Sequence, residues 1–248
     1  SMHLCVVSDH GHSPVEQHFD LARAMRGAGL RVRSHPWTLP DRSEVAVMVS
    51  GNSMAHLYLD LEHRERRPWP SLSAEWEPRL GAFLAHPAID LVATMENEST
   101  VMVRRGAASA DITVGPRGLT YRATNGNPLG VQPFEDECDE SVHERTFESE
   151  YPDSVRQLAR LLLAERSGDV VISAAPGWDL RQAYEPINHV SSHGALHASH
   201  MLVPLVCNRR FESAPRQTAD LYRLLAAKLK PGARQPVEQT FAGADAGR

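Results

Sequence analysis

The sequence predicts an α/β protein in which helices cover both faces of a mostly parallel sheet, a three-layer α/β/α arrangement. Two observations support this class. At both ends of the chain, segments with helical periodicity alternate with short apolar runs, as in sheets whose strands are connected by helices. Between residues 89 and 124, several strand-like runs follow one another without a helix, so we expect a small antiparallel β insertion there.

The first part of the chain predicts a strand, a helix and three further strands. The apolar run at residues 3–7 predicts a buried strand. Apolar residues between 15 and 25 recur at helical spacing, with Ser13-Pro14 as the cap and first residue, and with glycines at 27 and 29 as the stop. The next strands are predicted at 31–37, 45–50 and 54–61, and Gly51-Asn52-Ser53 forms the turn between the last two.

The middle of the chain predicts one helix, four short strands and a loop. A proline-rich stretch leads into a helix that begins near Pro78 and ends before His86-Pro87. Strands follow at 89–95, 100–104, 111–114 and 119–123. Residues 125–150 contain an acidic cluster, at 135–140, whose spacing does not match a calcium loop. We therefore expect a long surface loop with solvated carboxylates.

The α/β alternation returns after residue 150. We expect a helix at 152–165, strands at 169–174 and 201–207, a helix at 218–229 and a disordered tail at 230–248. The predicted organisation has four parts: a first part of the α/β core with the metal motif at 1–66, an insertion with a helix, antiparallel strands and the acidic loop at 67–150, a second part of the core at 151–229, and the tail.

Composition is typical of a globular protein and excludes some classes of partner. The 248 residues are 42% hydrophobic and 23% charged, and the net charge of −5 leaves no basic stripe for a nucleic-acid polymer. The apolar runs are shorter than the roughly 18 residues of a spanning helix, so we expect no membrane segment. Cys5, Cys138 and Cys207 are widely spaced, which favours reduced thiols in a cytoplasmic protein, two of them in the core.

Two short motifs carry the chemistry of the sequence. Ser8-Asp9-His10-Gly11 follows the first predicted strand, and Ser191-Ser192-His193-Gly194 repeats the pattern with a single histidine. Ligands bind at the carboxyl ends of strands in open α/β sheets. A carboxylate oxygen and imidazole nitrogens suit zinc or manganese, and the glycines allow sharp bends. These motifs therefore predict a metal site.

These motifs resemble the carboxyl half of the alkaline phosphatase superfamily, and in particular its type I phosphodiesterase and nucleotide pyrophosphatase branch. The resemblance is carried by Ser-Asp-His-Gly at 8–11, by His-Gly at 193–194 with the following segment 200–205, and by Arg166-Ser167-Gly168-Asp169, which leads into an apolar strand. It covers residues 3–12 and 151–229 well, whereas residues 13–150 match loosely.

The resemblance implies a hydrolase that binds two divalent metal ions, usually zinc, with manganese as the alternative. Asp9 and His10 would bind one ion and His193 the other. The first strand and the carboxyl half must then lie side by side, so that these three residues reach one site. The fold implied is a partial alkaline phosphatase-like α/β/α sheet. The substrate implied is a small-molecule phosphoester.

The catalytic nucleophile of this family, a threonine or serine, precedes the Asp-His motif, and only eight residues precede Asp9 here. We therefore expect the chain to be a carboxyl-terminal portion of the enzyme that lacks the nucleophile and is inactive in isolation. Three protein ligands divided between two ions predict weak metal binding.

Three further histidines lie near the motifs. His12, His197 and His200 are expected around the metal ligands, at the rim or as residues that orient them. Because His193 and His197 are four residues apart, a helix would place both on one face, and with His200 they could form a three-histidine zinc site without other ligands. Gly194 favours a loop instead.

Two classes of function remain open from the sequence. The first is the metal-dependent phosphoester hydrolase. The second is a non-catalytic module derived from that fold, which would bind a ligand or partner through the face where an amino-terminal half should pack, and which predicts an apolar patch and self-association. A sulfatase or phosphomutase relative is a third possibility, since the same metal motif serves those reactions.

Overall fold

The computed structural model describes residues 4–36, 42–62, 66–183, 187–211, 213 and 215–229. The chain divides into two compact units. The core unit comprises residues 10–202, and the terminal unit comprises residues 1–9 and 203–248. The predicted tail at 230–248 lies outside the described residues, as does Trp37 at the end of one predicted strand.

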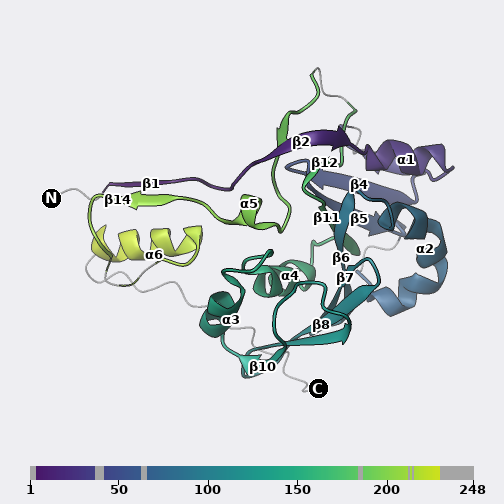
Figure 1. The fold of residues 1–248 in the computed structure, drawn as a ribbon. Coiled ribbons are helices and arrows are strands. Elements are labelled where there is room, and N and C mark those ends of the chain that lie inside the picture. The colour runs from purple at the N-terminus through teal and green to yellow at the C-terminus, as the bar shows by residue number, and fades with distance from the viewer. Residues whose placement is uncertain are drawn as a thin grey trace. The chain divides into compact units, whose positions relative to one another are not determined.

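A mixed sheet of nine described strands forms the centre of the core unit, with the strand order β10-β9-β8-β7-β6-β11-β5-β4-β3 (Figure 1). The strands are β3 (Val32–Ser34), β4 (Val45–Ser50), β5 (Met54–Leu59), β6 (Ile89–Asn97), β7 (Thr100–Arg105), β8 (Ala108–Val114), β9 (Leu119–Asn125), β10 (Phe134–Glu137) and β11 (Val170–Ala174). The α/β class is confirmed.

The expectation that the sheet is mostly parallel is wrong. Among the described strands of this sheet, β3 and β4 pair in parallel, and every other neighbouring pair is antiparallel. Strands β6 to β9 follow one another through short turns, and such turns can join only antiparallel neighbours. The strands predicted between 89 and 123 are confirmed, but they continue the same sheet as β4 and β5.

Strand β11 joins the two halves of this sheet. It lies between β5 and β6, with Ile172 opposite Ala55 on one side and Val92 on the other. All five of its residues are buried. Successive side chains point to opposite faces, so Ile172 packs into one apolar core and Val171 into the other.

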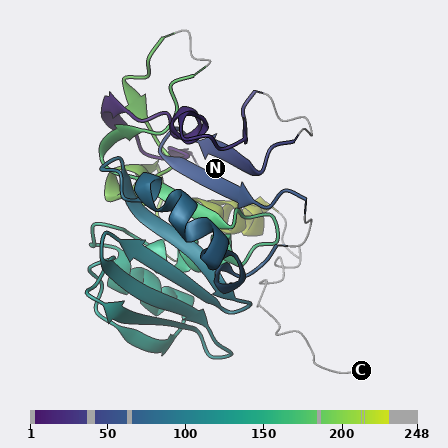
Figure 2. The same ribbon diagram turned by 90° about the vertical axis from the view of Figure 1, so that its right-hand side faces the viewer.

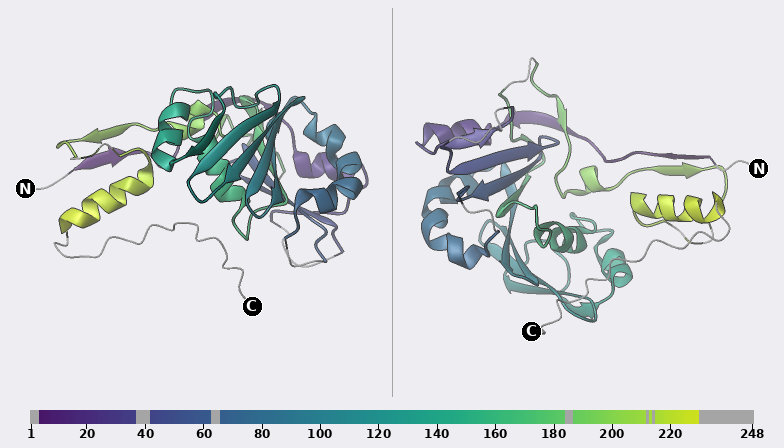
Figure 3. Two further views of the ribbon diagram at one scale, coloured as in Figure 1. Left: turned by 90° about the horizontal axis from the view of Figure 1, so that it is seen from below. Right: turned by 180° about the vertical axis from the view of Figure 1, so that it is seen from behind.

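Helices cover both faces of the sheet (Figures 2 and 3). Helices α1 (Leu21–Gly27) and α2 (Trp69–Leu84) lie on one face, where Met25, Trp76 and Leu80 are fully buried. Helices α3 (Asp139–Thr146) and α4 (Ser154–Leu162) lie on the other face, where Leu158 and Leu162 are buried. This burial of apolar surface is the main stabilising contribution to the core unit.

Three predicted elements of the core unit are wrong. Residues 13–18 form strand β2 instead of a helix, and α1 begins only after Asp20, whose carboxylate caps it by accepting from the Arg23 N–H at 2.8 Å. Helix α2 begins at Trp69 and continues through Pro78. The predicted loop at 125–150 contains β10 and α3.

Strand β2 (Ser13–His18) is the centre of a small three-stranded sheet. It pairs in parallel with β12 (Gly177–Asp179) and antiparallel with β13 (Ser191–Ser192). A short helix, α5 (Ala198–Met201), follows β13 and replaces the beginning of the strand predicted at 201–207. This sheet therefore links residues near 13 to residues near 192.

The terminal unit contains a two-stranded ladder and one helix. Strand β1 (Cys5–Val7) pairs antiparallel with β14 (Leu205–Cys207), and α6 (Thr218–Leu229) follows. The expectation that β1 is a buried strand of the main sheet is wrong, because Val6 is 62% exposed and β1 pairs with β14. Across the described residues, none of the helices combines the length and apolar character that crossing a bilayer requires.

Candidate functional site

Strand register brings the two histidine motifs together. Ser192 of β13 lies opposite Ser13 of β2, and His193 and His12 are the next residues beyond this pair. The rings of His12 and His193 meet edge to face, with centroids 5.1 Å apart. The antiparallel pairing of β2 with β13 therefore accounts for a contact between residues far apart in the chain.

His10 completes a cluster with these two residues, called here the histidine cluster (His10, His12 and His193). The rings of His10 and His193 are stacked, with centroids 3.7 Å apart and planes inclined by only 4°. The His12 ring lies 4.9 Å from that of His10. The structure thus brings His10 and His193 together, and it adds His12, which the sequence predicted only as a residue that could orient a metal ligand or the phosphate.

The turn between β4 and β5 holds the backbone of His193. The His193 N–H donates to the Gly51 carbonyl at 2.8 Å, and the His193 carbonyl accepts from the Ser53 N–H at 3.1 Å. Gly51 has a φ of +57°, and a Cβ atom there would lie 2.5 Å from the His193 carbonyl oxygen and 2.6 Å from Nδ1 of its ring. Only glycine fits this position. The turn itself is a confirmed prediction, but its contact with His193 was not foreseen.

The loop at residues 10–12 packs directly on α5. The Gly11 N–H donates to the His200 carbonyl at 2.9 Å. A Cβ atom on Gly11 would lie 2.0 Å from the Ser199 carbonyl oxygen, so the two backbones approach as closely as a glycine allows. This contact holds the backbone at Gly11, and so sets the positions of its two neighbours, His10 and His12.

His200 is a buried anchor of the loop that carries His193. Its Nδ1 accepts from the Ala195 N–H at 3.0 Å, so Nε2 carries the hydrogen and donates to Ser13 Oγ at 2.6 Å. Burial, together with the neighbouring histidines, lowers the pKa of His200 to about 4. The imidazole is therefore neutral at physiological pH and binds β2 to the loop.

His197 lies apart from the histidine cluster. Its side chain caps α5 by accepting from the Ser199 N–H, and its ring meets that of Tyr151 edge to face at 6.4 Å. Because His197 is used as a helix cap, the alternative in which His193, His197 and His200 form one zinc site has no geometric support here. Asp9 belongs to the terminal unit and is exposed.

The geometry of the stacked rings bears on metal binding. An ion bound by an imidazole lies close to the plane of that ring, because the nitrogen lone pair lies in this plane. Two parallel rings 3.7 Å apart cannot both bind one ion. They can each bind a separate ion, and the ions of two-metal sites lie about 3.5–4 Å apart. Among the described residues, no three His, Cys, Asp or Glu side chains surround a single metal position. His10 and His193 can therefore supply one nitrogen ligand each to two separate ions.

A buried carboxylate lies next to this site, and sequence reasoning missed it. Asp179 is fully buried, and its Oδ2 lies 3.5 Å from His18 Nδ1 and 3.8 Å from His189 Nδ1. It also accepts from Asn52 Nδ2 at 3.3 Å. Asn52 forms a β-bridge with His193, so this carboxylate is linked to the histidine cluster through one residue. No motif in the sequence indicates the arrangement, since its members are widely separated.

An apolar pocket of about 260 Å³ adjoins the loop that follows His193. It lies between α4 and the strands β5, β6 and β11, and its lining includes Met54, Ala93, Leu161, Gly194 and Leu196. An apolar cavity of about 150 Å³ is sufficient to bind benzene. The pocket can therefore accept an aromatic ring or a short alkyl chain.

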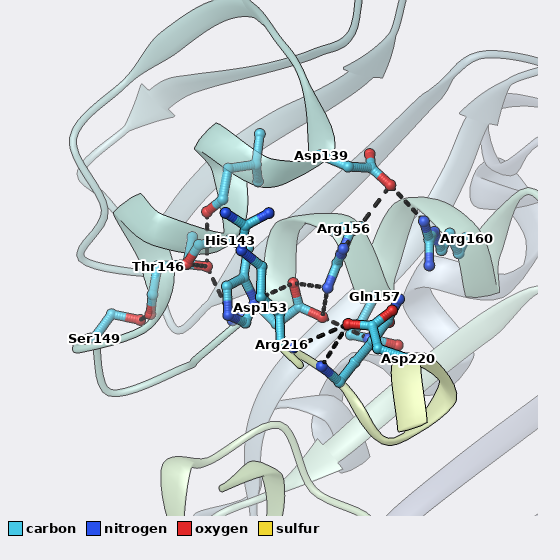
Figure 4. A network of polar contacts seen from close by, with 12 residues as sticks. Asp139, His143, Thr146, Ser149, Asp153, Arg156, Gln157, Arg160, Arg216 and Asp220 are labelled. Atoms are coloured by element: carbon cyan, nitrogen blue, oxygen red, sulfur yellow. Dashed lines mark hydrogen bonds and ion pairs between the residues drawn. The ribbon is translucent and has the colours of Figure 1, made fainter. Parts of the chain in front are cut away.

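The acidic cluster at 135–140 is largely exposed to solvent, as expected, but it lies on β10 and α3 and forms ion pairs there. Glu135 pairs with Arg122, Asp136 with Arg117, Glu137 with Arg145, and Asp139 with Arg160. The buried Asp153 meets His143 of α3 and Arg156 of α4 (Figure 4). The four pairs of the cluster connect two helices and the edge of the sheet, but most of their side chains are exposed, so each contributes little to stability.

Comparison with protein-family models, with curated proteins and with solved structures found no match to this chain. The residues themselves are therefore the basis for any functional assignment.

Proposed function

We propose that this chain carries part of the two-metal centre of a phosphoester hydrolase related to the alkaline phosphatase superfamily. The observation that supports this is the stacking of the His10 and His193 rings, whose centroids are 3.7 Å apart. The two motifs that carry them lie near the first and last residues of the core unit in the sequence. Stacked imidazoles place their nitrogen lone pairs in parallel planes, and the 3.7 Å between the rings matches the spacing of about 3.5–4 Å between the ions of two-metal sites.

Each residue has a role in this proposal. His10 and His193 are neutral ligands, so acid competes with the metal for their nitrogens. His12 orients the phosphoryl group, since its ring lies within about 5 Å of both ligand rings. The apolar pocket beside Gly194 takes the organic group of the ester. When bound, two divalent ions, zinc or manganese, would activate the attacking oxygen and stabilise the leaving oxygen. The remaining ligands and the nucleophile come from residues outside this set.

Zinc titration of the whole chain tests the proposal. Calorimetry should detect weak zinc binding, because few protein donors face each ion. His10→Ala and His193→Ala should each reduce zinc affinity by about tenfold or more, equivalent to about 1.4 kcal/mol. The matched control is His35→Ala, because His35 is an exposed histidine on a different loop.

Far-ultraviolet circular dichroism establishes that each variant is folded before its affinity is compared. Equal zinc affinities in all four proteins would contradict the proposal. A chromogenic phosphodiester should not be hydrolysed by the chain alone, and rapid turnover would show that the nucleophile lies within it.

A further inference from the structure

Cys5 and Cys207 are directly opposite each other in the terminal unit. Their strands, β1 and β14, pair antiparallel with Cys5 in register with Cys207. The Asn208 N–H donates to the Leu4 carbonyl at 3.1 Å, so the neighbouring pair Leu4–Asn208 is hydrogen-bonded. Hydrogen-bonded and non-hydrogen-bonded residue pairs alternate along an antiparallel ladder, so the next pair, Cys5–Cys207, is a non-hydrogen-bonded one. The Cα atoms of such a pair are about 4.5 Å apart. This separation is within the range that a disulfide spans.

The two thiols already touch. The Cys207 Sγ donates a hydrogen bond to the Cys5 Sγ at 2.9 Å. Both side chains are half-buried, so a small oxidant can reach them. The third cysteine, Cys138, is exposed and belongs to the core unit. Of the three cysteines, Cys5 and Cys207 are therefore the two whose thiols are in contact.

We propose that Cys5 and Cys207 are a reversible dithiol–disulfide pair that covalently joins β1 to β14. The oxidant is a small-molecule disulfide such as oxidised glutathione. One cysteine thiolate attacks it and releases one glutathione thiolate, and the second cysteine thiolate then attacks the mixed disulfide and releases the other. The two protein thiols lose two electrons and two protons in total, and one glutathione disulfide becomes two glutathione molecules.

The bond has a clear structural consequence. A two-stranded ladder is marginally stable in water, and β1 and β14 form such a ladder. The two cysteines are 202 positions apart in the chain, so the disulfide closes a very long loop of the unfolded chain. Oxidation should therefore reduce opening of the ladder.

The chemistry also predicts a pH dependence. The hydrogen bond to Cys5 raises the pKa of Cys207 to about 11. Only the thiolate attacks a disulfide, so oxidation should become faster as the pH rises above neutrality.

The experiment uses the whole chain with Cys138→Ser, which removes the third thiol. After incubation with oxidised glutathione, both remaining thiols should be lost to maleimide labelling, the intact mass should fall by two hydrogens, and a non-reducing peptide map should show Cys5 linked to Cys207. Amide exchange at Val6 and Val206 should become slower. Reducing agent should reverse all four changes.

Single-cysteine controls separate a true pair from two independent thiols. Cys5→Ser and Cys207→Ser, each in the Cys138→Ser background, should stop at a stable mixed disulfide with glutathione. The unsubstituted chain gives a second test, because after oxidation Cys138 should be the cysteine found outside the Cys5–Cys207 peptide. The proposal is overturned if the two-cysteine protein keeps both thiols, carries two glutathione adducts, or forms only intermolecular dimers.

Discussion

At the scale of single residues, the histidine cluster depends on two glycines. Gly51 accepts the His193 N–H on its carbonyl and leaves no room for a Cβ atom against the His193 ring. The Gly11 N–H donates to the His200 carbonyl, and a Cβ atom on Gly11 would clash with the Ser199 carbonyl oxygen. The imidazoles supply the chemistry, but the backbone contacts at these glycines set where the imidazoles lie.

Gly51→Ala should therefore displace His193. The added Cβ atom would clash with the His193 carbonyl and ring, which should cost about 1–3 kcal/mol of unfolding free energy beyond the strain of the positive φ. The matched control is Gly106→Ala, since Gly106 has a φ of +56° and nothing within 4 Å of the added atom. The control should show only the strain, roughly 1–2 kcal/mol.

Urea unfolding and the imidazole resonances of His193 measure this difference. Gly51→Ala should shift those resonances and weaken zinc binding, whereas Gly106→Ala should leave both unchanged. Indistinguishable behaviour of the two variants would show that the turn does not position His193.

At the scale of elements, α3 and α4 are joined by a buried charge network. Asp153 and Arg156 are each less than one tenth exposed, and the Arg156 Nη2 lies 2.8 Å from the Asp153 carboxylate (Figure 4). Asp153 Oδ2 also accepts from Gln157 Nε2 at 2.6 Å. Removing one partner of such a pair leaves an uncompensated charge in the interior.

Asp153→Asn should destabilise the core unit by about 3 kcal/mol. Asparagine tolerates the positive φ of 60° at this position, so the substitution removes little beyond the charge. We expect the lower end of the usual range because the Asp139 carboxylate lies 3.9 Å from Arg156. The control is Arg160→Ala, which removes the exposed pair with Asp139 and should cost less than about 1 kcal/mol. Thermal and urea unfolding of both variants would check this, and equal losses would contradict it.

At the scale of the whole core unit, β11 joins two groups of strands, β3 to β5 and β6 to β10, into one sheet. It pairs with β5 on one side and with β6 on the other, and its side chains enter both apolar cores. The strands that the sequence assigned to a small insertion therefore share their hydrogen bonds and their packing with the remainder of the sheet. We expect the two groups of strands to unfold together.

Ile172→Ala tests this cooperativity. The truncation should cost about 2–5 kcal/mol, because Ile172 is fully buried in the centre of the sheet. Hydrogen exchange should show equal losses of protection at Val103 in β7 and Val47 in β4. Val206→Ala, at a 65% exposed position of β14, should change stability by less than about 0.5 kcal/mol. Unchanged protection at Val103 would indicate that β6 to β10 fold independently.

Local sequence patterns were sufficient for features that depend on neighbours in the chain. The strands between 89 and 125, the turn at 51–53 and the helix at 218–229 follow from alternation, turn residues and helical spacing within a few residues. Competing local signals explain the error at residues 13–18, where helical spacing of apolar residues was outweighed by pairing with β12 and β13. Asp20, which caps the helix through the Arg23 N–H, then sets the beginning of α1.

The sequence identified His10 and His193 as candidates for one site, because two similar motifs with the same residue chemistry are visible in the chain. The fold was needed to show that the two rings stack and that His12 joins them. It also shows that Asp179 is linked to His193 through Asn52, and that β11 lies between β5 and β6. These features arise from contacts between residues such as Asn52 and Asp179, 127 positions apart. Such contacts depend on strand register and burial across the whole sheet, which short-range periodicity does not encode.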